Sequence, residues 1–411
     1  MITRNDALSL DAGDPLAPLR EEFLLPEGVI YLDGNSLGPL HRDVAATIER
    51  VVHGEWAQGL IRSWNDAAWI DLPVRVGEKI APLIGAAPGQ VVCCDSVSVN
   101  LFKLLGASFE LRPGRRVLLS ERGNFPTDLY VADGAARVLA GGHEMRLVAR
   151  AELESALGPD VAVLMLTQVD FRTGELHDMA RLVRAAHDAG ALVLWDLSHS
   201  VGAMAIDLDA LEVDFAIGGT YKFLNGGPGS PAFLYVAERH QSQLRTPIQG
   251  WLGHAAPFDF SEQYEPAPGV ARFIAGTPDV VAMSAVEAAL GIWERVTPRA
   301  VRQKSEALTE LFIRLVAERL DGHGFEVASP LDPGRRGSQV SLRHPDAYAV
   351  MQALIARNVI GDFRAPDLLR FGFAPLYTRF VDAFDAIEHL VAVVESNEHA
   401  GARYHDRATV T

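Results

Sequence analysis

The order of apolar runs and helical patterns in the middle of the chain constrains its fold more than any other feature. Residues 178–190 have apolar side chains at helical spacing and end in glycine, a common helix C-cap. Strands that alternate with helices predict an α/β fold with a mostly parallel sheet and helices on both faces. The five short apolar runs expected to form strands here, several bordered by turn residues, are 115–120, 161–169, 191–196, 213–219 and 231–237.

The rest of the chain divides into further parts. Residues 41–52 have the spacing of a helix and follow an irregular N-terminal arm. Residues 279–296 are expected to form one long helix, after which strands interleaved with helices predict a smaller α+β domain. Its expected strands are 324–329, 338–344, 357–363 and 368–374. We therefore expect an arm and helix over 1–50, a large domain over 51–278, a small domain over 279–396 and a poorly ordered polar tail over 397–411.

Composition excludes several classes of function. The 411-residue chain has 48% hydrophobic residues, enough for a large core, and a formal net charge of −16. This charge argues against nucleic-acid binding, which requires a basic surface, but not against a small anion in a local basic pocket. The two cysteines, Cys93 and Cys94, are adjacent, which indicates a reducing compartment rather than a disulfide. No stretch resembles a signal peptide or a membrane span, so we expect a cytoplasmic protein without membrane contact.

Polar residues follow the apolar runs at the sheet edge where ligands bind in open parallel sheets. Asp196 ends one run, and Lys222 stands between the end of another run and a loop of glycines. Because the carboxyl ends of parallel strands meet at one edge, we expect these side chains to face one crevice. The set expected there is Phe125, Asp128, Thr167, Asp196, His199, Tyr221 and Lys222.

A buried aspartate and a buried lysine that face one crevice have two interpretations. A structural salt bridge is the more common one, because buried charges are usually paired. The other is a site for pyridoxal phosphate (PLP), whose aldehyde requires a lysine amine and whose ring nitrogen requires a carboxylate. The phosphate would bind N–H groups at a helix N-terminus, which residues 95–109 offer after Ser96. Each signal alone is common, but together they begin to favour the cofactor.

Seven segments carry a more specific signal: YLDGNSLGPL (31–40), DSVSVNLFKLL (95–105), NFPTDLY (124–130), WDLSHSVGAM (195–204), GGTYKFLNGGPG (218–229), QGWLGH (249–254) and AGTPDV (275–280). In order and spacing they resemble kynureninase, a family of fold-type-I PLP enzymes, over residues 25–395. Asp-x-x-His followed by Tyr-Lys occurs in several related families, whereas GNSLG, FPTD and GWLGH together are typical of kynureninase. The resemblance implies a mostly parallel seven-stranded sheet flanked by helices.

The resemblance also implies roles around PLP. Lys222 would bond to the cofactor aldehyde and move protons at the substrate α-carbon, with Asp196 on the ring nitrogen and Phe125 stacked on the ring. Tyr221 would reach the phosphate and donate a proton later. Trp251 and Thr277 would reach the cofactor of a second subunit in a homodimer with shared active sites, although the family often has asparagine at the position of Thr277. The other cofactor contacts implied are Val97, Ser98, Pro126, Thr127, Asp128, Thr167 and His199.

The implied reaction is the hydrolysis of L-kynurenine to anthranilate and L-alanine, a step of tryptophan degradation, and it involves no metal. Arg370 would clamp the substrate α-carboxylate, because a guanidinium fork matches a carboxylate. Trp64 stands where relatives that favour 3-hydroxykynurenine tend to carry histidine. Because an indole offers no acceptor, we expect plain L-kynurenine to be preferred. The substrate contacts implied are Asn35, Ser36, Trp64 and Arg370.

Two other interpretations belong to different classes. Another fold-type-I enzyme, an aminotransferase or a cysteine desulfurase, would have a similar cofactor site. A desulfurase would, however, need a reactive cysteine late in the chain, and the only cysteines are Cys93 and Cys94. A PLP-dependent regulator would add a basic DNA-binding module, which this sequence lacks. Product analysis with kynurenine separates these possibilities.

Overall fold

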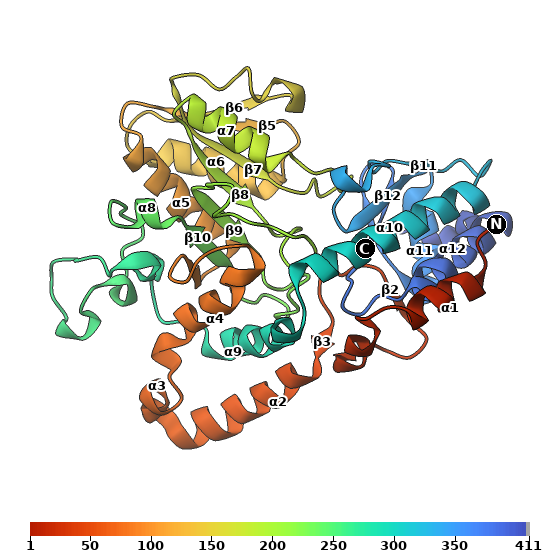
Figure 1. Cartoon of the computed structure of the whole chain (residues 1–411), viewed down its shortest axis with the longest axis horizontal. Coiled ribbons are helices and arrows are strands. Elements are labelled where there is room, and N and C mark those ends of the chain that lie inside the picture. The colour runs from red at the N-terminus through yellow and green to blue at the C-terminus, as the bar shows by residue number, and fades with distance from the viewer. Residues whose placement is uncertain (408–411) are drawn as a thin grey trace.

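The computed structural model describes residues 1–407, which form a large lobe, a small lobe and a helical projection below them (Figure 1). The large lobe is built on a seven-stranded sheet in the order β4-β10-β9-β8-β7-β5-β6. Only the pairs made by β10 are antiparallel. The predicted α/β class and the mostly parallel seven-stranded sheet are therefore confirmed. The strands are β4 (Val91–Cys93), β5 (Val117–Glu121), β6 (Glu144–Val148), β7 (Val161–Thr167), β8 (Leu192–Asp196), β9 (Phe215–Gly218) and β10 (Phe233–Val236).

Helices cover both faces of this sheet, which explains why β7 and β8 are continuous apolar runs rather than alternating ones. On one face, α5 (Val97–Leu111) and α6 (Pro126–Val138) pack against the sheet. On the other face lie α4 (Leu72–Ile80), α7 (Met179–Asp188) and α9 (Val280–Ala289). The short helix α8 (Glu238–Gln241) follows β10.

The small lobe has its own sheet and core. Four antiparallel strands lie in the order β11-β12-β15-β14, and helices α10, α11 and α12 supply most of the core beside them. Its elements are α10 (Pro298–Arg319), β11 (Glu326–Val327), β12 (Gln339–Arg343), α11 (Ala347–Ala356), β13 (Val359–Ile360), β14 (Asp362–Arg364), β15 (Leu368–Gly372) and α12 (Phe380–Glu395).

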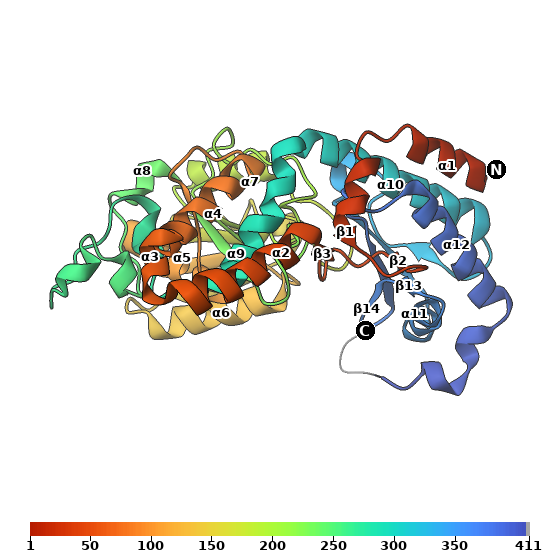
Figure 2. The same ribbon diagram turned by 90° about the horizontal axis from the view of Figure 1, so that it is seen from below.

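The N-terminal segment joins the small lobe, as the view from below shows (Figure 2). The expected irregular arm instead begins with helix α1 (Arg4–Ala12), whose Ala7 is buried in the small-lobe core. Further on, β1 (Phe23–Leu24) pairs with β3 (Leu40–His41), and β2 (Ile30–Tyr31) pairs in parallel with β13.

The helical projection starts at the predicted helix 41–52. Helix α2 (Arg42–Arg50) continues as a π-helix over Val51–Gly59, and helix α3 (Ser63–Asp66) lies at the far end (Figure 1). None of the helices between residues 1 and 407 is long and apolar enough to cross a membrane.

Several expected elements differ from the structure. The long helix expected over 279–296 is α-helical only to Ala289 and continues as 3-10 turns over Leu290–Arg295. The strand expected over 357–363 is two strands, β13 and β14, which belong to different sheets. The tail is not uniformly irregular, because Tyr404 is buried in the small-lobe core after short 3-10 turns. Residues 408–411 of that expected tail lie outside the described residues.

Candidate active site

The carboxyl ends of β7, β8 and β9 bring the expected polar side chains to one cavity of about 320 Å³. Thr167 is the last residue of β7 and Asp196 the last of β8, while Lys222 follows β9 by four positions. The structure thus places Phe125, Asp128, Thr167, Asp196, His199, Tyr221 and Lys222 in one cavity, whereas Asp170 and Thr173, the polar residues that follow β7, do not line it. The cavity is lined by Ser96, Val97, Ser98, Phe125, Thr127, Asp128, Thr167, Phe171, Asp196, Ser198, His199, Gly219, Tyr221, Lys222, Gly229, Ser230 and Ala232.

Lys222 differs from the other lysines because its amine forms no ion pair with a carboxylate in the part of the chain that the structure describes. The chain has four lysines, and Lys79, Lys103 and Lys304 each pair with a carboxylate. Within residues 1–407, no carboxylate lies within 4.0 Å of the Lys222 amine. Lys222 therefore does not form a structural salt bridge with these residues, which leaves a reactive amine as its interpretation.

The surroundings of Lys222 make its amine easier to deprotonate than the amine of an ordinary lysine. Burial, helped by the positive charges of Arg370 and Arg364, lowers the pKa of Lys222 to about 8, and Asp196 opposes this shift. A neutral amine is the form that attacks an aldehyde. The loop around Gly38 packs closely against the Lys222 backbone, because a Cβ at Gly38 would lie 2.3 Å from the carbonyl oxygen of Lys222.

Two neighbouring carboxyl groups, Asp128 and Asp196, line the cavity together with Lys222. Burial and the neighbouring carboxylate of Asp196 raise the pKa of Asp128 well above its usual range. Asp128 therefore keeps its proton to a higher pH than an ordinary aspartate does, and Thr167 Oγ1 lies 3.3 Å from its Oδ2. The Ser198 backbone N–H donates to Asp196 Oδ1 at 2.7 Å and fixes the orientation of that carboxylate.

The cavity also contains the N-terminus of helix α5, which can bind an anion, and the aromatic ring of Phe125. Helix α5 begins at Val97, and the Ser96 side chain caps it by accepting from the N–H of Val99 at 3.4 Å. The first N–H groups of a long helix have no partner inside the helix, so they can bind a phosphate. On the far side, Phe125 presents its ring to the cavity, with Phe171 edge-on to it at a centroid distance of 5.3 Å.

His199 lies beside this cavity as a neutral side chain. Burial and the positive charges of Lys222 and Arg370 lower its pKa well below the usual range. His199 Nδ1 lies 3.2 Å from Gln339 Oε1, and Gln339 is also 3.3 Å from Asn35 Nδ2. Gln339 thereby links the large lobe to the segment before α2.

Arg370 is buried at the boundary between the two lobes, and its guanidinium already donates hydrogen bonds to other residues of the chain. Its Nε donates to Asp362 Oδ1 at 2.8 Å, and its Nη2 donates to Asp362 Oδ2 and, at 2.9 Å, to Ser36 Oγ. Its Nη1 donates to the Phe171 carbonyl at 2.6 Å. The side of the guanidinium formed by Nε and Nη2 is thus occupied by Asp362, and an incoming carboxylate would meet the Nη1 side.

Several expected residues lie elsewhere in the single chain. Trp64 is on α3 in the projection, where its ring packs against Trp69 at 5.9 Å, and it does not line the Lys222 cavity. Trp251 is partly exposed on a 3-10 turn. Thr277 lines a neighbouring cavity of about 340 Å³ that shares Ser96, Gly229 and Ser230 with the first. Pro126 is the first residue of α6 and lies next to Phe125 and Thr127.

Sequence reasoning missed several residues of the site: Asn124, Phe171, Ser198, Gln339 and Asp362. Asn124 Oδ1 accepts the Thr167 hydroxyl at 2.5 Å and so holds the end of β7. The polar positions directly after a strand end could have indicated Asn124 and Ser198. Gln339 and Asp362 belong to the small lobe, and no local pattern signals their contact with this site.

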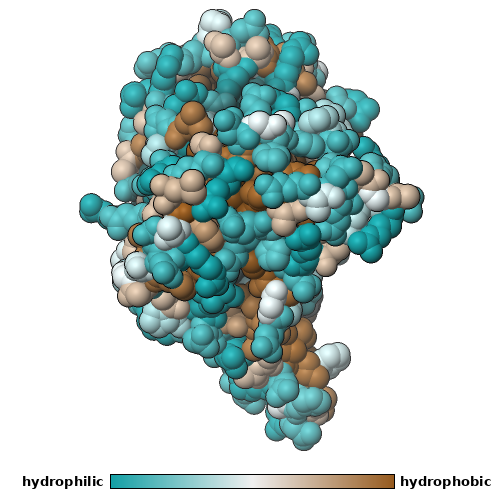
Figure 3. Space-filling view, turned by 90° about the vertical axis from the view of Figure 1, so that its right-hand side faces the viewer, coloured by the Kyte–Doolittle hydropathy of each residue, from teal (hydrophilic) through white to brown (hydrophobic). Residues whose placement is uncertain are grey.

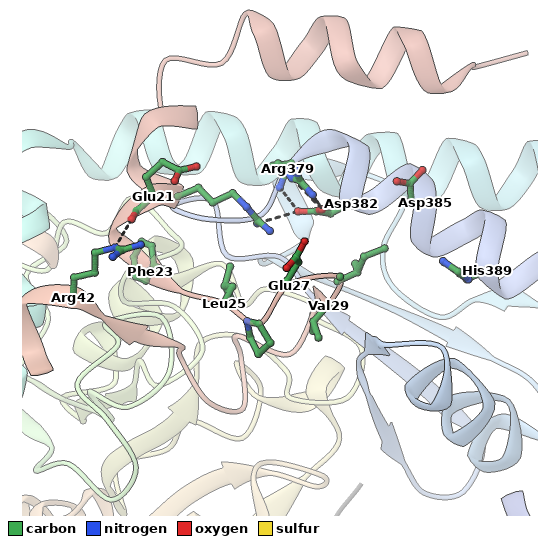
Figure 4. A pocket seen from close by; sticks show the side chains of 14 residues that line it. Glu21, Phe23, Leu25, Glu27, Val29, Arg42, Arg379, Asp382, Asp385 and His389 are labelled. Atoms are coloured by element: carbon green, nitrogen blue, oxygen red, sulfur yellow. Dashed lines mark hydrogen bonds and ion pairs between the residues drawn. The ribbon is translucent and has the colours of Figure 1, made fainter.

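A third cavity, of about 510 Å³, lies between residues 20–30 and helix α12 (Figure 4). The arginines there already have partners: Arg379 and Arg20 both bind Asp382, and Arg42 donates to the Glu21 carbonyl. None of the expected site residues lines this cavity. Among residues 1–407, no group of three or more His, Cys, Asp or Glu side chains could hold a metal ion.

Comparison with known proteins gives full-length relatives. Residues 301–390 match the family described as Kynureninase C-terminal domain. The chain is 51% identical to a kynureninase of Burkholderia pseudomallei (strain 1106a) and 48% identical to one of Pseudomonas fluorescens, with 100% of each chain covered.

Solved structures share the fold at lower identity. The apo cysteine desulfurase of Thermococcus onnurineus NA1 has a TM-score of 0.78 at 18% identity and covers 92% of this chain and 98% of its own. A mutant of the cystine C-S lyase C-DES, with glycine covalently linked to its PLP cofactor, has the same score and identity and covers 91% and 98%. These structures support the fold alone, whereas the full-length relatives show the family: the chain belongs to the kynureninase family.

Proposed function

We propose that this protein is a PLP-dependent hydrolase that cleaves L-kynurenine to anthranilate and L-alanine. The observation that carries the proposal is the buried, unpaired amine of Lys222 in one cavity with Asp196 and the start of α5. Those three features match the aldehyde, the ring nitrogen and the phosphate of PLP. Membership of the kynureninase family supplies the substrate.

The residues of the cavity fit the cofactor. Lys222 would hold its aldehyde, Asp196 its protonated ring nitrogen, and Phe125 the face of its ring. The N-terminal N–H groups of α5 at Val97 and Ser98 would hold the phosphate. When bound, PLP supplies the electron sink that allows the substrate bonds to break.

Protons are handled by two neighbouring side chains. The depressed pKa of Lys222 leaves its amine able to accept the proton from the substrate α-carbon near neutral pH. Burial and the charge of Asp196 raise the pKa of Tyr221, so its hydroxyl keeps a proton that it can donate. Arg370 binds the substrate α-carboxylate, and Ser36 and Asn35 lie beside it.

A homodimer with shared active sites accounts for Trp64, Trp251 and Thr277. The projection exposes large apolar side chains, with Trp56, Leu60 and Ile61 at 59%, 61% and 78% exposure. Figure 3 shows apolar surface along this lower projection. Apolar surface of this kind is typical of a protein contact, so we infer that a second copy covers it and receives Trp64 near its substrate ring.

A cysteine desulfurase is the other candidate that the fold allows. Cys93 and Cys94 are both buried next to β10, and burial raises the pKa of Cys94 to about 12. Neither thiol is therefore a reactive nucleophile. The cysteine arrangement thus favours kynurenine hydrolysis over sulfur transfer.

Product analysis tests the proposed function. Purified protein with PLP should convert L-kynurenine to anthranilate and L-alanine in equal amounts, measured by chromatography. Lys222→Ala should abolish the conversion, and the matched control Lys79→Ala, at a partly exposed lysine that pairs with Glu294, should retain it. Release of a keto acid, or of sulfide from cysteine without anthranilate formation, would contradict the proposal.

A further inference from the structure

Two arginines share one carboxylate at the boundary between the lobes. Asp362 on β14 lies directly opposite Arg370 on β15 in the antiparallel pair. Its Oδ2 accepts from Arg370 Nη2 and lies 2.7 Å from Nη2 of Arg364, two residues further along β14. Residues two apart on a strand point to the same face, so Arg364 and Asp362 approach Arg370 from the same side.

The charges of this cluster decide whether Arg370 can attract an anion. Asp362 balances the charge of Arg370, and Asp33 faces both of them from the segment after β2. Arg370 and Asp362 alone therefore present no net charge to a substrate carboxylate. Arg364 adds the missing positive charge through its ion pair with Asp362.

Arg364 acts on the Lys222 cavity as well as on Asp362. Its positive charge contributes to lowering the pKa of both Lys222 and His199, after burial and the charge of Arg370. Its guanidinium is partly open to solvent, and its Nε has no hydrogen-bond partner within residues 1–407. Arg364 can therefore act on this site through its charge, which its ion pair with Asp362 holds in place.

We propose that Arg364 is the second cation of the substrate-carboxylate site, which offsets Asp362 so that Arg370 keeps a net positive charge for the α-carboxylate. This role rests on the proposed function, because it assumes an amino-acid substrate. Arg364 is a positioning residue that acts through Asp362 and Arg370. Charge on the substrate is the feature that it selects.

The test compares steady-state constants for L-kynurenine. Arg364→Met should raise KM by about tenfold or more, since it leaves Asp362 to cancel the charge of Arg370, while kcat changes little. Arg364→Lys should restore much of the KM because it keeps the charge. The matched control is Arg343→Met on neighbouring β12, an arginine that pairs with Glu326 and Asp367 and should leave KM unchanged.

A double variant separates charge compensation from a simple packing role. In an Asp362→Asn background there is no carboxylate to offset, so the further change Arg364→Met should cost much less in KM than it does alone. An equal cost in both backgrounds, or a wild-type KM for Arg364→Met, would overturn the inference. Arg364→Gln gives the same comparison where the methionine variant fails to fold. Absence of kynurenine cleavage by the unaltered protein would instead refute the proposed function.

Discussion

Asp33 is a carboxyl group whose ionisation changes the substrate-carboxylate site. Burial, followed by the negative charge of Asp362, raises the pKa of Asp33 to about 7, and Arg370 opposes the shift. Below this pH Asp33 is neutral, and above it a second negative charge stands beside Arg370. The charged and titratable groups that face it are Tyr31, Asp362, Arg364, Arg370 and Tyr377.

The KM for L-kynurenine should therefore rise with pH. As Asp33 ionises through about pH 7, Arg370 loses part of its attraction for the substrate, and we expect KM to increase roughly threefold to tenfold. In Asp33→Asn the carboxyl group cannot ionise, so this increase should disappear. KM measured at several pH values for both proteins checks this, and parallel profiles would contradict it.

Individual residues were predictable from the sequence where they end a strand. Asp196 and Thr167 end β8 and β7, and Lys222 follows β9, so parallel topology alone brings them together. Asp362 was not predictable, because its contact with Arg370 depends on the register of two short strands. The hydrogen bond between Arg370 and Ser36 joins positions 334 residues apart, which no local pattern reveals.

At the scale of elements, hydrogen bonds to Asp214, the residue before β9, connect β8, α7 and α8. This buried carboxylate accepts hydrogen bonds from His187 Nε2 at 2.9 Å, His240 Nε2 at 2.6 Å and Arg239 Nη2 at 2.7 Å. The N–H of Val193 on β8 also donates to it at 2.9 Å. Burial alone would raise the pKa of Asp214, but the hydrogen bonds from the two histidines lower it below its usual range.

Asp214→Asn should lower the free energy of unfolding by about 3 kcal/mol. The substitution removes the negative charge that pairs with Arg239 and accepts the surrounding hydrogen bonds. A carboxylate with a lowered pKa stabilises the fold above the pKa of the unfolded chain. The difference between wild type and variant should therefore shrink as the pH falls below about 4. Denaturant unfolding at several pH values measures this. Asp188→Asn, at the exposed end of α7, is the control, and an equally large loss there would contradict the prediction.

The sequence predicted long apolar strands better than short or interrupted elements. The buried strands β7 and β8 were recognised because apolar runs on both faces are typical of a parallel sheet. The three-residue strand β4 and the less buried β6 were not picked out individually. The sequence predicts a single strand over 357–363, whereas β13 and β14 within this segment pair in different sheets, which the order of residues alone does not reveal.

For the whole molecule, a single chain does not bring Trp64 to the cavity, so the proposed dimer is required for its role. Mixing Lys222→Ala with Trp64→Ala protein should then create hybrid sites in which an intact Lys222 meets an intact Trp64. Activity should reappear in the mixture above the sum of the separate proteins. A fully active monomer by light scattering would contradict the shared site. The proposed contacts could not be derived from the order of elements, since they would lie between two copies of the chain.

Trp64 is also expected to determine whether the enzyme prefers L-kynurenine or 3-hydroxykynurenine. Trp64 offers the ring of plain L-kynurenine a stacking surface but no acceptor for a 3-hydroxyl group. We expect kcat/KM to favour L-kynurenine over 3-hydroxykynurenine by about 5-fold to 150-fold, the cost of an unpaired hydroxyl group. Trp64→His should shift the ratio toward the hydroxylated substrate. Equal values in wild type, or no shift in the variant, would show that Trp64 does not set the preference.

Lys222, which has no carboxylate partner within residues 1–407, is the lysine that we propose binds the cofactor. Borohydride reduction of the PLP-loaded protein, followed by peptide mass spectrometry, tests it most directly, because the chain has only four lysines to distinguish. We predict that the reduced cofactor is found on the peptide that contains Lys222 and on no other lysine peptide. A label on Lys79, Lys103 or Lys304, or no bound cofactor at all, would contradict the account.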